Sequence, residues 1–422
     1  MSTQTTQDAR TISNTPFEAN GRQYRPSAQP IVVVCIDGCE DAYLNAAIVR
    51  GRMPRLTEIA AGGYRGMARA ALPSFTNVNN SAIATGAPPS VTGISGNFFL
   101  DPNTGEQKMM NSASYLRCGT IFAAASAAGR KVAVITAKDK LREILGHEMT
   151  GIAFSAEKAN QTTMAVHGIE NVEQIVGAPT PEIYSADASL FVLRAGVSLL
   201  TEGLADFLYL SLTDYMQHKF APEAAESLDF YEAMDTEFGR LLDCGAVLGL
   251  TADHGMNAKH DADGLPNVIY LESLLHDQFG EGAQVICPIT DPYVLHHGAL
   301  GSLVMVHLDD SSQADSIGRW ILSLDGISDV FDRESAATKL QLPADRIGDL
   351  VVMSARDCVI GRTAADHDLS QLSGGLRSHG GRYEEMVPFI VSEPLDAQYA
   401  AQASGDVRNF DIYEYTCNGV HA

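Results

Sequence analysis

The stretch IVVVCIDG, residues 31–38, decides the fold class of this chain. Its first six residues are apolar and mostly β-branched, a pattern typical of a strand that is buried on both faces. The strand ends at Asp37-Gly38, where two residues typical of turns follow each other. Similar apolar runs recur at 131–136 (KVAVIT), 207–212 (FLYLSL) and 246–251 (AVLGLT). Each run is predicted to be a buried strand.

Helical patterns separate these strands. Residues 54–61 begin with proline and are followed by two glycines, both of which are typical of helix boundaries. The alternation of strands and helices predicts an α/β fold with a mostly parallel sheet covered by helices on both faces. The further elements expected in this part are helices over 77–84, 121–128, 188–200 and 223–242, and strands over 66–72 and 387–391.

The pattern changes after Met256. We expect residues 257–376 to form a smaller, inserted α+β cap domain. The core then comprises residues 31–256 and 377–422, and the polar residues 1–30 are expected to be a flexible lead-in. The predicted cap strands cover 285–289, 303–307 and 349–353, and the predicted cap helix covers 315–324.

Composition excludes several classes of protein. The 422 residues carry a net charge of −23, which opposes binding to nucleic acid. No stretch of about 18 residues is free of charges and turn formers, so no membrane span is expected. The first thirty residues lack the apolar segment of a secretory signal, and we expect a cytoplasmic protein. The seven cysteines, an odd number, are predicted to be structural and not a disulfide framework.

Three aspartates directly follow three of the predicted strands. Asp37, Asp214 and Asp253 each come just past a strand end, and the carboxyl ends of parallel strands lie at one edge of a sheet, where ligands bind. We therefore expect these carboxylates to lie close together. Histidines accompany two of them. His218 lies four residues after Asp214, the spacing of two ligands on one helical face, and His254 directly follows Asp253.

Two further residues are candidates for the same site. His379 lies in the segment SHGG, and Thr76 lies at the predicted start of a helix. Each candidate also has an ordinary interpretation: Asp37 as a turn former, Thr76 as a helix cap and His379 as a loop histidine. Their joint occurrence at loop positions favours a divalent-metal site, and oxygen and imidazole ligands favour zinc over magnesium.

Basic residues are informative in a chain this acidic. A small anionic substrate is repelled unless metal ions or a few lysines reverse the field locally. Lys138 and Lys140 are two residues apart just after the strand at 131–136, so on an extended segment both face the same side. They are candidates for binding an anion, although a solvated loop of mixed charge is the alternative. Tyr215 and Arg377 adjoin candidate metal ligands and are weaker candidates. We interpret the pair His296-His297 as structural.

The order of these motifs resembles the alkaline phosphatase superfamily. The motifs are IDG, PSFTNVNNSAIATG, GISGN, TDYMQH, TADHGM and SHGG, and the resemblance runs from residue 31 to about residue 388. It is closest to the nucleotide pyrophosphatase/phosphodiesterase-like branch. Within that branch, FTNVNN and the lysine pair in TAKDK are similar to the phosphonoacetate hydrolases. The resemblance implies an alkaline phosphatase-like three-layer sandwich with the inserted cap.

The resemblance also implies a site with two Zn²⁺ ions per chain. One ion would be held by Asp214, His218 and His379. The other would be held by Asp37, Asp253 and His254, with the oxygen of the nucleophile Thr76 reaching it. Asn97 matches the position of a side chain that donates a hydrogen bond to a phosphoryl oxygen. The implied substrate-binding residues are Asn97, Lys138, Lys140 and Tyr215.

The implied reaction is hydrolysis of the C–P bond of phosphonoacetate through a phosphothreonine. Its leaving group is an enolate-like acetate that needs positive charge for stabilisation. The alternative with the same metals and nucleophile is a phosphodiesterase or nucleotide pyrophosphatase, which needs an aromatic platform for a base, whereas aromatic residues make up only 7% here. A metal-dependent phosphomutase and a catalytically silent binding protein are less favoured. The oligomeric state is left open, with a homodimer among the candidates.

Overall fold

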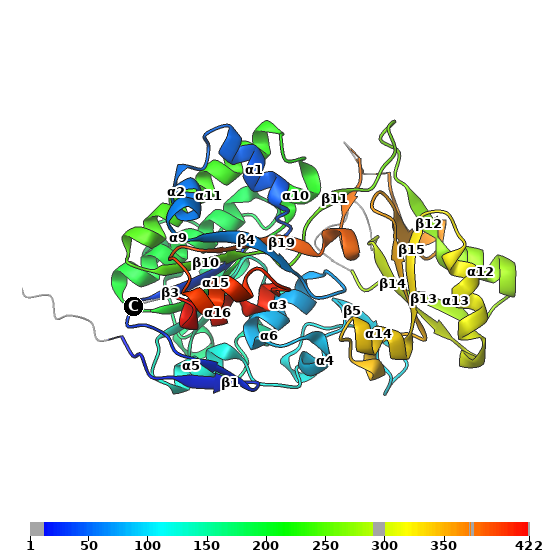
Figure 1. The fold of residues 1–422 in the computed structure, drawn as a ribbon, viewed down its shortest axis with the longest axis horizontal. Coiled ribbons are helices and arrows are strands. Elements are labelled where there is room, and N and C mark those ends of the chain that lie inside the picture. Colours follow the sequence, from blue (N-terminus) through cyan, green and yellow to red (C-terminus); the bar gives the residue numbers. More distant parts are fainter. Residues whose placement is uncertain (1–11, 290–299, 371, 373–374, 421–422) are drawn as a thin grey trace, which may run out of the picture.

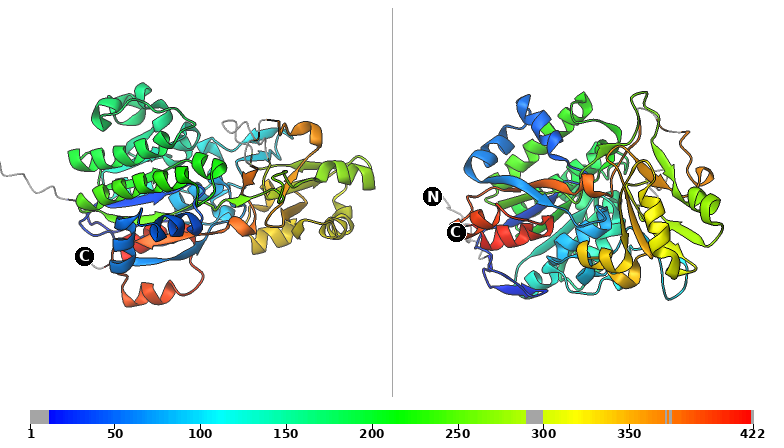
Figure 2. Two further views of the ribbon diagram at one scale, coloured as in Figure 1. Left: turned by 90° about the horizontal axis from the view of Figure 1, so that it is seen from above. Right: turned by 45° about the vertical axis from the view of Figure 1, so that its right-hand side comes forward.

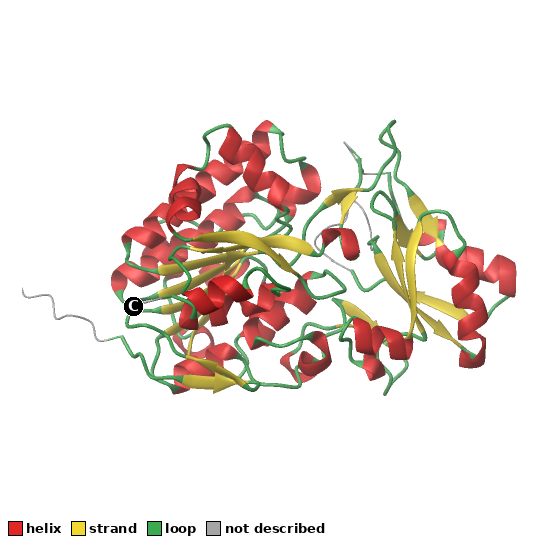
Figure 3. Cartoon of the chain, viewed as in Figure 1, coloured by secondary structure: helices red, strands yellow, loops and turns green. Residues whose placement is uncertain are grey.

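The main body of the molecule is a seven-stranded sheet with helices on both faces (Figures 1 and 3). A computed structural model describes residues 12–289, 300–370, 372 and 375–420. The strands, in spatial order, are β4 (Tyr64–Arg69), β19 (Met386–Val391), β10 (Val247–Thr251), β3 (Ile31–Cys35), β9 (Phe207–Ser211), β7 (Val132–Thr136) and β8 (Gly151–Ser155).

The five strands from β10 to β8 run parallel to one another. β19 runs opposite to the other six strands of this sheet, because it is antiparallel to both β10 and β4. The predicted α/β fold with a mostly parallel sheet is confirmed. The strand expected at 66–72 instead spans Tyr64–Arg69, because its partner β19 begins at Met386, opposite Arg69.

Helices bury both faces of this sheet. Every residue of β3, β7, β9 and β10 is buried, which explains why these strands are almost wholly apolar. One face carries α1 (Asp41–Val49), α2 (Pro54–Gly62), α9 (Ala186–Glu202) and α11 (Ala225–Asp243) (Figure 1). The other carries α3 (Thr76–Thr85), α5 (Ile121–Ala127), α6 (Arg142–Leu145) and α16 (Ile412–Asn418). Among the described residues, no helix is long and apolar enough to cross a lipid bilayer.

A second, smaller sheet stands beside the main body (Figure 2). Its four strands are antiparallel, in the order β13 (Ala283–Ile286), β14 (Leu303–Leu308), β16 (Leu350–Ser354) and β15 (Ile327–Asp332). It carries α12 (Leu271–Phe279), α13 (Ala314–Leu322) and α14 (Arg333–Lys339). β14, β16 and α13 match the strands expected at 303–307 and 349–353 and the helix expected at 315–324, and β13 overlaps the strand expected at 285–289. The strand β15 and the helices α12 and α14 were not predicted. The boundaries 257 and 376 of a separate domain stay a prediction.

An apolar cluster joins the two sheets. Phe75 and Val78, on either side of Thr76 in the sequence, pack in one buried cluster with Leu303 and Met305 of β14. The start of α3 therefore lies where the main body meets the smaller sheet. Any site at Thr76 is bordered by both.

The N-terminal residues differ from the expected flexible lead-in. β1 (Phe17–Ala19) and β2 (Arg22–Tyr24) form a hairpin that packs on the core. The rings of Phe17 and Tyr24 stack with centroids 5.2 Å apart, and Phe17 also meets the edge of Phe207 at the start of β9. The prediction was wrong for this part because two aromatic side chains in a polar segment suffice to dock it.

Replacing Tyr24 by alanine tests this docking. Tyr24 is fully buried, so we expect Tyr24→Ala to lower the free energy of unfolding by about 3 kcal/mol. The control Gln23→Ala changes an exposed side chain of the same strand and should alter stability by less than about 0.5 kcal/mol. Urea unfolding followed by circular dichroism measures both. Equal stability of the two variants would contradict a docked hairpin.

Candidate metal centre and active site

Four parallel strands deliver polar residues to one edge of the main sheet. Asp37, Asp214 and Asp253 follow the carboxyl ends of β3, β9 and β10, and Lys138 follows the end of β7. Because β10, β3, β9 and β7 are consecutive neighbours in the sheet, these side chains come from adjacent positions. All four residues are buried. The expected meeting of the three carboxylates at a single edge agrees with this geometry.

The first group of possible metal ligands consists of Asp214, His218 and His379. Each offers one ligand atom, and the three atoms lie within 4.8 Å of one another. The short helix α10 (Tyr215–Lys219) begins after Asp214 and puts His218 one turn further along. His218 Nε2 lies 2.9 Å from Asp214 Oδ2, and His379 Nε2 lies 3.9 Å from the same oxygen.

The second group consists of Asp37, His254 and Asp214, again with ligand atoms within 4.8 Å. His254 Nε2 lies 3.2 Å from Asp37 Oδ1. Asp214 thus belongs to both groups. Asp253 lies beside the second group, with Oδ2 3.8 Å from His254 Nε2. That Asp253 binds a metal stays a prediction.

Hydrogen bonds hold both oxygens of Asp253. Its Oδ1 accepts from the N–H groups of Gly38 (3.3 Å) and His254 (3.1 Å), and its Oδ2 accepts from Asn80 Nδ2 (3.1 Å). Asn80 also donates to the carbonyl of Thr76 at 3.0 Å, and the hydroxyls of Tyr209 and Ser211 donate to its Oδ1. Sequence analysis missed Asn80, although it lies one helical turn after Thr76. Through these hydrogen bonds, Asn80 connects the Asp253 carboxylate to the start of α3.

The three histidines share one orientation. In each, Nδ1 lies beside a backbone carbonyl oxygen: Arg377 O for His218 (3.0 Å), Gly255 O for His254 (2.9 Å) and Ser74 O for His379 (2.8 Å). A carbonyl can only accept, so Nδ1 carries the proton and donates. In the neutral form of each imidazole the lone pair is then on Nε2, which faces the carboxylates. This arrangement, in which an outer hydrogen bond selects the tautomer, is typical of metal-binding histidines.

The electrostatics of the cluster favour a cation. Burial, together with the neighbouring Asp214 and Asp253 carboxylates, raises the pKa of Asp37 to about 8. Its buried Oδ1 has His254 Nε2 as its neighbour at 3.2 Å and accepts no other hydrogen bond. Burial lowers the pKa of His254, yet the charges of Asp253 and Asp37 raise it to about 10. Buried carboxylate oxygens and oriented imidazole nitrogens together are a donor set that fits divalent metal ions, zinc in particular.

Thr76 faces the second group. It is the first residue of α3, is 5% exposed, and its Oγ1 lies 3.4 Å from His254 Nε2. The next residue, Asn77, donates its backbone N–H to Asn97 Oδ1 at 2.9 Å. This bond fixes the Asn97 carboxamide, since the oxygen accepts and Nδ2 is left as the donor end. Asn97, the predicted substrate-binding residue, is therefore hydrogen-bonded to Asn77, the residue after Thr76.

Lys138 and Lys140 follow β7 but not as an extended segment. Lys138 is buried, and its Nζ lies 3.2 Å from Asp214 Oδ1. Lys140, also buried, lies in a 3₁₀ turn formed by Asp139–Leu141. The prediction that alternate residues of an extended strand carry them is wrong, because Asp139 Oδ atoms bond Arg142 and Lys158 and close the turn. A role of both lysines in substrate binding stays a prediction.

The weaker candidates have other partners. The ring of Tyr215 lies under the Lys219 ammonium at 4.8 Å and next to the ring of Tyr184. Arg377 donates to the carbonyls of Gln217 and Met256 and to the hydroxyl of Tyr43. Its guanidinium therefore connects the loops of His218 and His254 and points at these partners. His296 and His297 lie outside the described residues. All seven cysteines are free thiols, as predicted.

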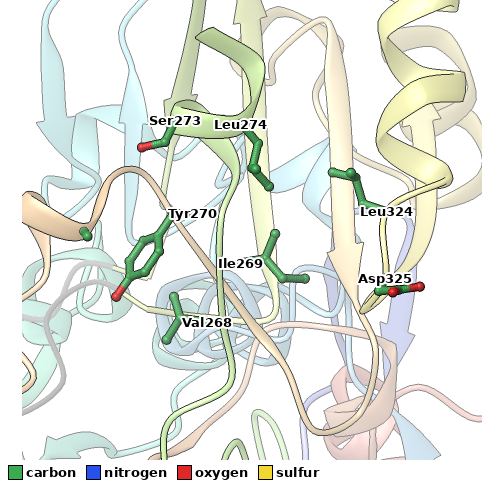
Figure 4. Close-up of a pocket in the computed structure, with 8 residues that line it drawn as sticks. Val268, Ile269, Tyr270, Ser273, Leu274, Leu324 and Asp325 are labelled. Atoms are coloured by element: carbon green, nitrogen blue, oxygen red, sulfur yellow. The ribbon is translucent and has the colours of Figure 1, made fainter. Parts of the chain in front are cut away.

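One pocket, lined by β12 (Val268–Tyr270), α12 and the segment after α13, is apolar and separate from this centre (Figure 4). It has a volume of about 550 Å³, and its lining includes Val268, Ile269, Leu274, Leu324 and Asp325. It has one carboxylate and no histidine among its lining residues. None of its lining residues belongs to the two groups of possible metal ligands.

Comparison with known proteins identifies the class. The model of the type I phosphodiesterase / nucleotide pyrophosphatase family matches residues 31–382. The chain belongs to this family, a branch of the alkaline phosphatase superfamily. Among solved structures, it is similar to phosphonoacetate hydrolase from Sinorhizobium meliloti 1021 in complex with phosphonoformate. The identity is 46% and the TM-score 0.91, over 97% of this chain and all of the other.

Two further structures bear on the fold and the ligand. The same Sinorhizobium meliloti enzyme in complex with phosphonoacetate is 45% identical, with the same coverage and TM-score. Murine ectonucleotide pyrophosphatase / phosphodiesterase 5 is 15% identical, with a TM-score of 0.59 over 92% of this chain and 94% of the other. That second likeness shows the shared fold only.

Metal removal tests the centre. Since each carboxylate and imidazole of the site gains a partner when a metal ion binds, zinc at 100 times its dissociation constant should stabilise the protein by about 2.7 kcal/mol per site. We expect His379→Ala to lose much of the zinc-dependent rise in Tm, whereas the control His260→Ala, at a half-buried histidine outside both ligand groups, keeps it. Differential scanning fluorimetry with zinc or with a chelator measures the rise. Identical rises in both variants would contradict the assignment of His379.

Proposed function

We propose that this chain is a phosphonoacetate hydrolase, which cleaves the carbon–phosphorus bond of phosphonoacetate to give acetate and phosphate. The observation that carries the proposal is a buried lysine, Lys138, 3.2 Å from the metal-site carboxylate Asp214 in a chain of net charge −23. A dianionic or trianionic substrate needs such a positive counter-charge. The similarity to an enzyme that was crystallised with phosphonoacetate supports the same substrate.

Two zinc ions are proposed as cofactors. Asp214, His218 and His379 would hold one, and Asp37, Asp253 and His254 would hold the other beside Thr76. When bound, zinc would act as a Lewis acid that lowers the pKa of the Thr76 hydroxyl and withdraws charge from the phosphoryl oxygens. The three Nδ1 hydrogen bonds to carbonyls hold the imidazoles ready for this role.

Thr76 is proposed as the nucleophile. Its Oγ1 attacks phosphorus in line with the P–C bond, the Thr76 proton passes to solvent, and a phosphothreonine forms. The electron pair of the broken P–C bond passes to the acetate carbon and delocalises into the neighbouring carboxylate as an enolate. Protonation of that carbon gives acetate. A water molecule then attacks the phosphothreonine, which releases phosphate and restores the hydroxyl.

Positive charge around the leaving group makes the first step feasible. The enolate spreads its charge onto the substrate carboxylate, so a cation beside that carboxylate stabilises the transition state more than the ground state. We propose that Lys138 and Lys140 supply it, and that Asn97 Nδ2 donates to a phosphoryl oxygen. Tyr215 is proposed only as a contact at the rim of the site, since its ring is partly buried beside Asp214.

Three broader expectations accompany this function. The smaller sheet with its helices is proposed as a cap domain over 257–376 that borders the site. The phosphonoacetate hydrolase function requires a compartment in which phosphonoacetate is present, and a cytoplasmic location stays a prediction. Assembly as a homodimer also stays a prediction.

A substrate comparison tests the proposed function. Zinc-loaded protein is mixed in turn with phosphonoacetate and with a nitrophenyl phosphodiester, and the release of phosphate, acetate and nitrophenol is measured. We expect equimolar phosphate and acetate, reduced at least a thousandfold in kcat by Thr76→Ala, which corresponds to about 4 kcal/mol. Turnover of the diester without acetate from phosphonoacetate would favour the phosphodiesterase alternative and contradict the enolate mechanism.

Substitution of the two lysines tests the origin of specificity. Lys138→Met and Lys140→Met keep the length of the side chain but remove its charge. We expect each to lower kcat/KM for phosphonoacetate at least tenfold, or about 1.4 kcal/mol. The control Lys158→Met removes a more exposed lysine that follows β8 and pairs with Asp139, which lies between the two lysines. Equal losses in all three variants would show that the segment's folding, and not a local charge, is responsible.

A further inference from the structure

A buried ion pair lies just outside the metal centre. Glu384 and Lys259 have fully buried side chains, and Lys259 Nζ lies 2.8 Å from Glu384 Oε1. Asn257 Nδ2 donates to the same oxygen at 2.7 Å. None of the three residues belongs to the groups of candidate metal ligands. Burying two charges is expensive, and a buried pair does not by itself stabilise a fold relative to apolar residues.

Glu384 bonds to both loops that carry metal-site histidines. Its carboxylate Oε2 accepts from the N–H of Gly381 at 3.1 Å, two residues after His379. Its backbone carbonyl accepts from the N–H of Gly255 at 2.8 Å, directly after His254. The rings of these two histidines are stacked, with centroids 3.5 Å apart and an interplanar angle of 6°. One residue therefore links a loop of the first ligand group to a loop of the second.

The partners of Glu384 anchor this link in regular structure. Asn257 begins β11 (Asn257–Ala258), which pairs with β18 (Arg377–Ser378), the strand that leads into His379. Lys259 also donates to the carbonyl of Arg356, which follows β16 of the smaller sheet. The ion pair thus lies where the main body meets the smaller sheet, near β11 in Figure 1.

We propose that Glu384 is a positioning residue for the metal centre, which holds the His254 and His379 loops in the register that lets both imidazoles bind zinc. Lys259 and Asn257 serve this role by fixing the carboxylate of Glu384. The inference rests on the proposed metal-dependent function and deepens it. It predicts that loss of the Glu384 charge weakens metal binding without removing any ligand.

The variant Glu384→Gln tests this role at constant shape. Three donors converge on the carboxylate: Lys259 Nζ, Asn257 Nδ2 and the Gly381 N–H. An amide offers one acceptor and one donor group, so its NH₂ must face at least one of these donors. Either the Gly381 loop, which carries His379, or the Lys259–Glu384 ion pair must then shift. Both changes disturb the position of His379.

The chain offers a matched control in the pair formed by Arg130 and Asp206. Arg130 Nε lies 2.7 Å from Asp206 Oδ1, and the Arg130 side chain is fully buried. Asp206 precedes β9 at the amino end of the parallel strands, so it lies at the opposite edge of the sheet from the metal centre. Asp206→Asn makes the same acid-to-amide change in a buried ion pair that has no link to a histidine loop.

The measurement is the zinc dissociation constant of the folded protein, by competition with a chromophoric chelator, together with the visible spectrum of the cobalt(II)-substituted protein. We expect Glu384→Gln to raise the dissociation constant about tenfold and to change the cobalt spectrum. Asp206→Asn should lower Tm but leave both readouts unchanged. Equal zinc affinity in wild type and Glu384→Gln would overturn the proposal, as would an equal loss in both variants.

A milder variant covers the case in which Glu384→Gln does not fold. Asn257→Ala removes one donor from Glu384 and leaves the ion pair in place, so it should weaken zinc binding in the same direction and by a smaller factor. Unchanged affinity in folded Asn257→Ala would then count against the proposal. Failure of the proposed function is distinguishable, because in that case the wild-type protein itself binds no zinc or releases no acetate from phosphonoacetate.

Discussion

The mutual repulsion of three buried carboxylates is the constraint on which the rest of the site depends. Asp37, Asp214 and Asp253 are almost completely shielded from solvent at adjacent strand ends. Two unit charges 4 Å apart repel by about 4 kcal/mol at an effective dielectric constant of 20. The rise in the pKa of Asp37 to about 8 expresses this cost together with that of burial. In a protein of net charge −23, such a cluster of carboxylates attracts cations strongly.

Oriented imidazoles and a lysine ammonium surround the three carboxylates and offset their repulsion. Three imidazoles present Nε2 to the carboxylates because carbonyl oxygens hold their Nδ1 protons. Lys138 approaches Asp214 from the neighbouring strand β7 and, with His218, lowers its pKa although burial raises it. Close packing is part of the same arrangement. Gly38 has φ 72°, and a Cβ there would lie 3.0 Å from the Cβ of Asp214, so a larger residue would separate the two loops.

The parallel sheet and most of the site were predictable from the sequence, for one physical reason. Buried strands are apolar, and a run such as IVVVCI shows where the carboxyl end of a strand falls, so polar residues just beyond several such ends converge. Asp37 and Asp214 needed only that argument, and His218 followed from its helical spacing of four residues after Asp214. The grouping of His379 with them depended on resemblance, because a loop histidine has no periodicity to reveal its position.

Other features were not readable from local patterns. The docking of the β1–β2 hairpin depends on contacts of Phe17 and Tyr24 with distant residues such as Phe207. The turn at Lys140 arises from ion pairs of Asp139 with Arg142 and Lys158. Asn80 and Glu384 were missed because their roles consist of hydrogen bonds between segments far apart in sequence, and a single sequence does not show such partners.

The buried cluster of carboxylates and imidazoles is proposed to hold two metal ions beside Thr76. The most direct measurement is an anomalous difference map from crystals of the zinc-loaded protein, recorded on both sides of the zinc absorption edge. Two peaks about 4 Å apart are expected, one among Asp214, His218 and His379 and one among Asp37, Asp253, His254 and Thr76. A single peak, or peaks away from these side chains, would contradict this proposal.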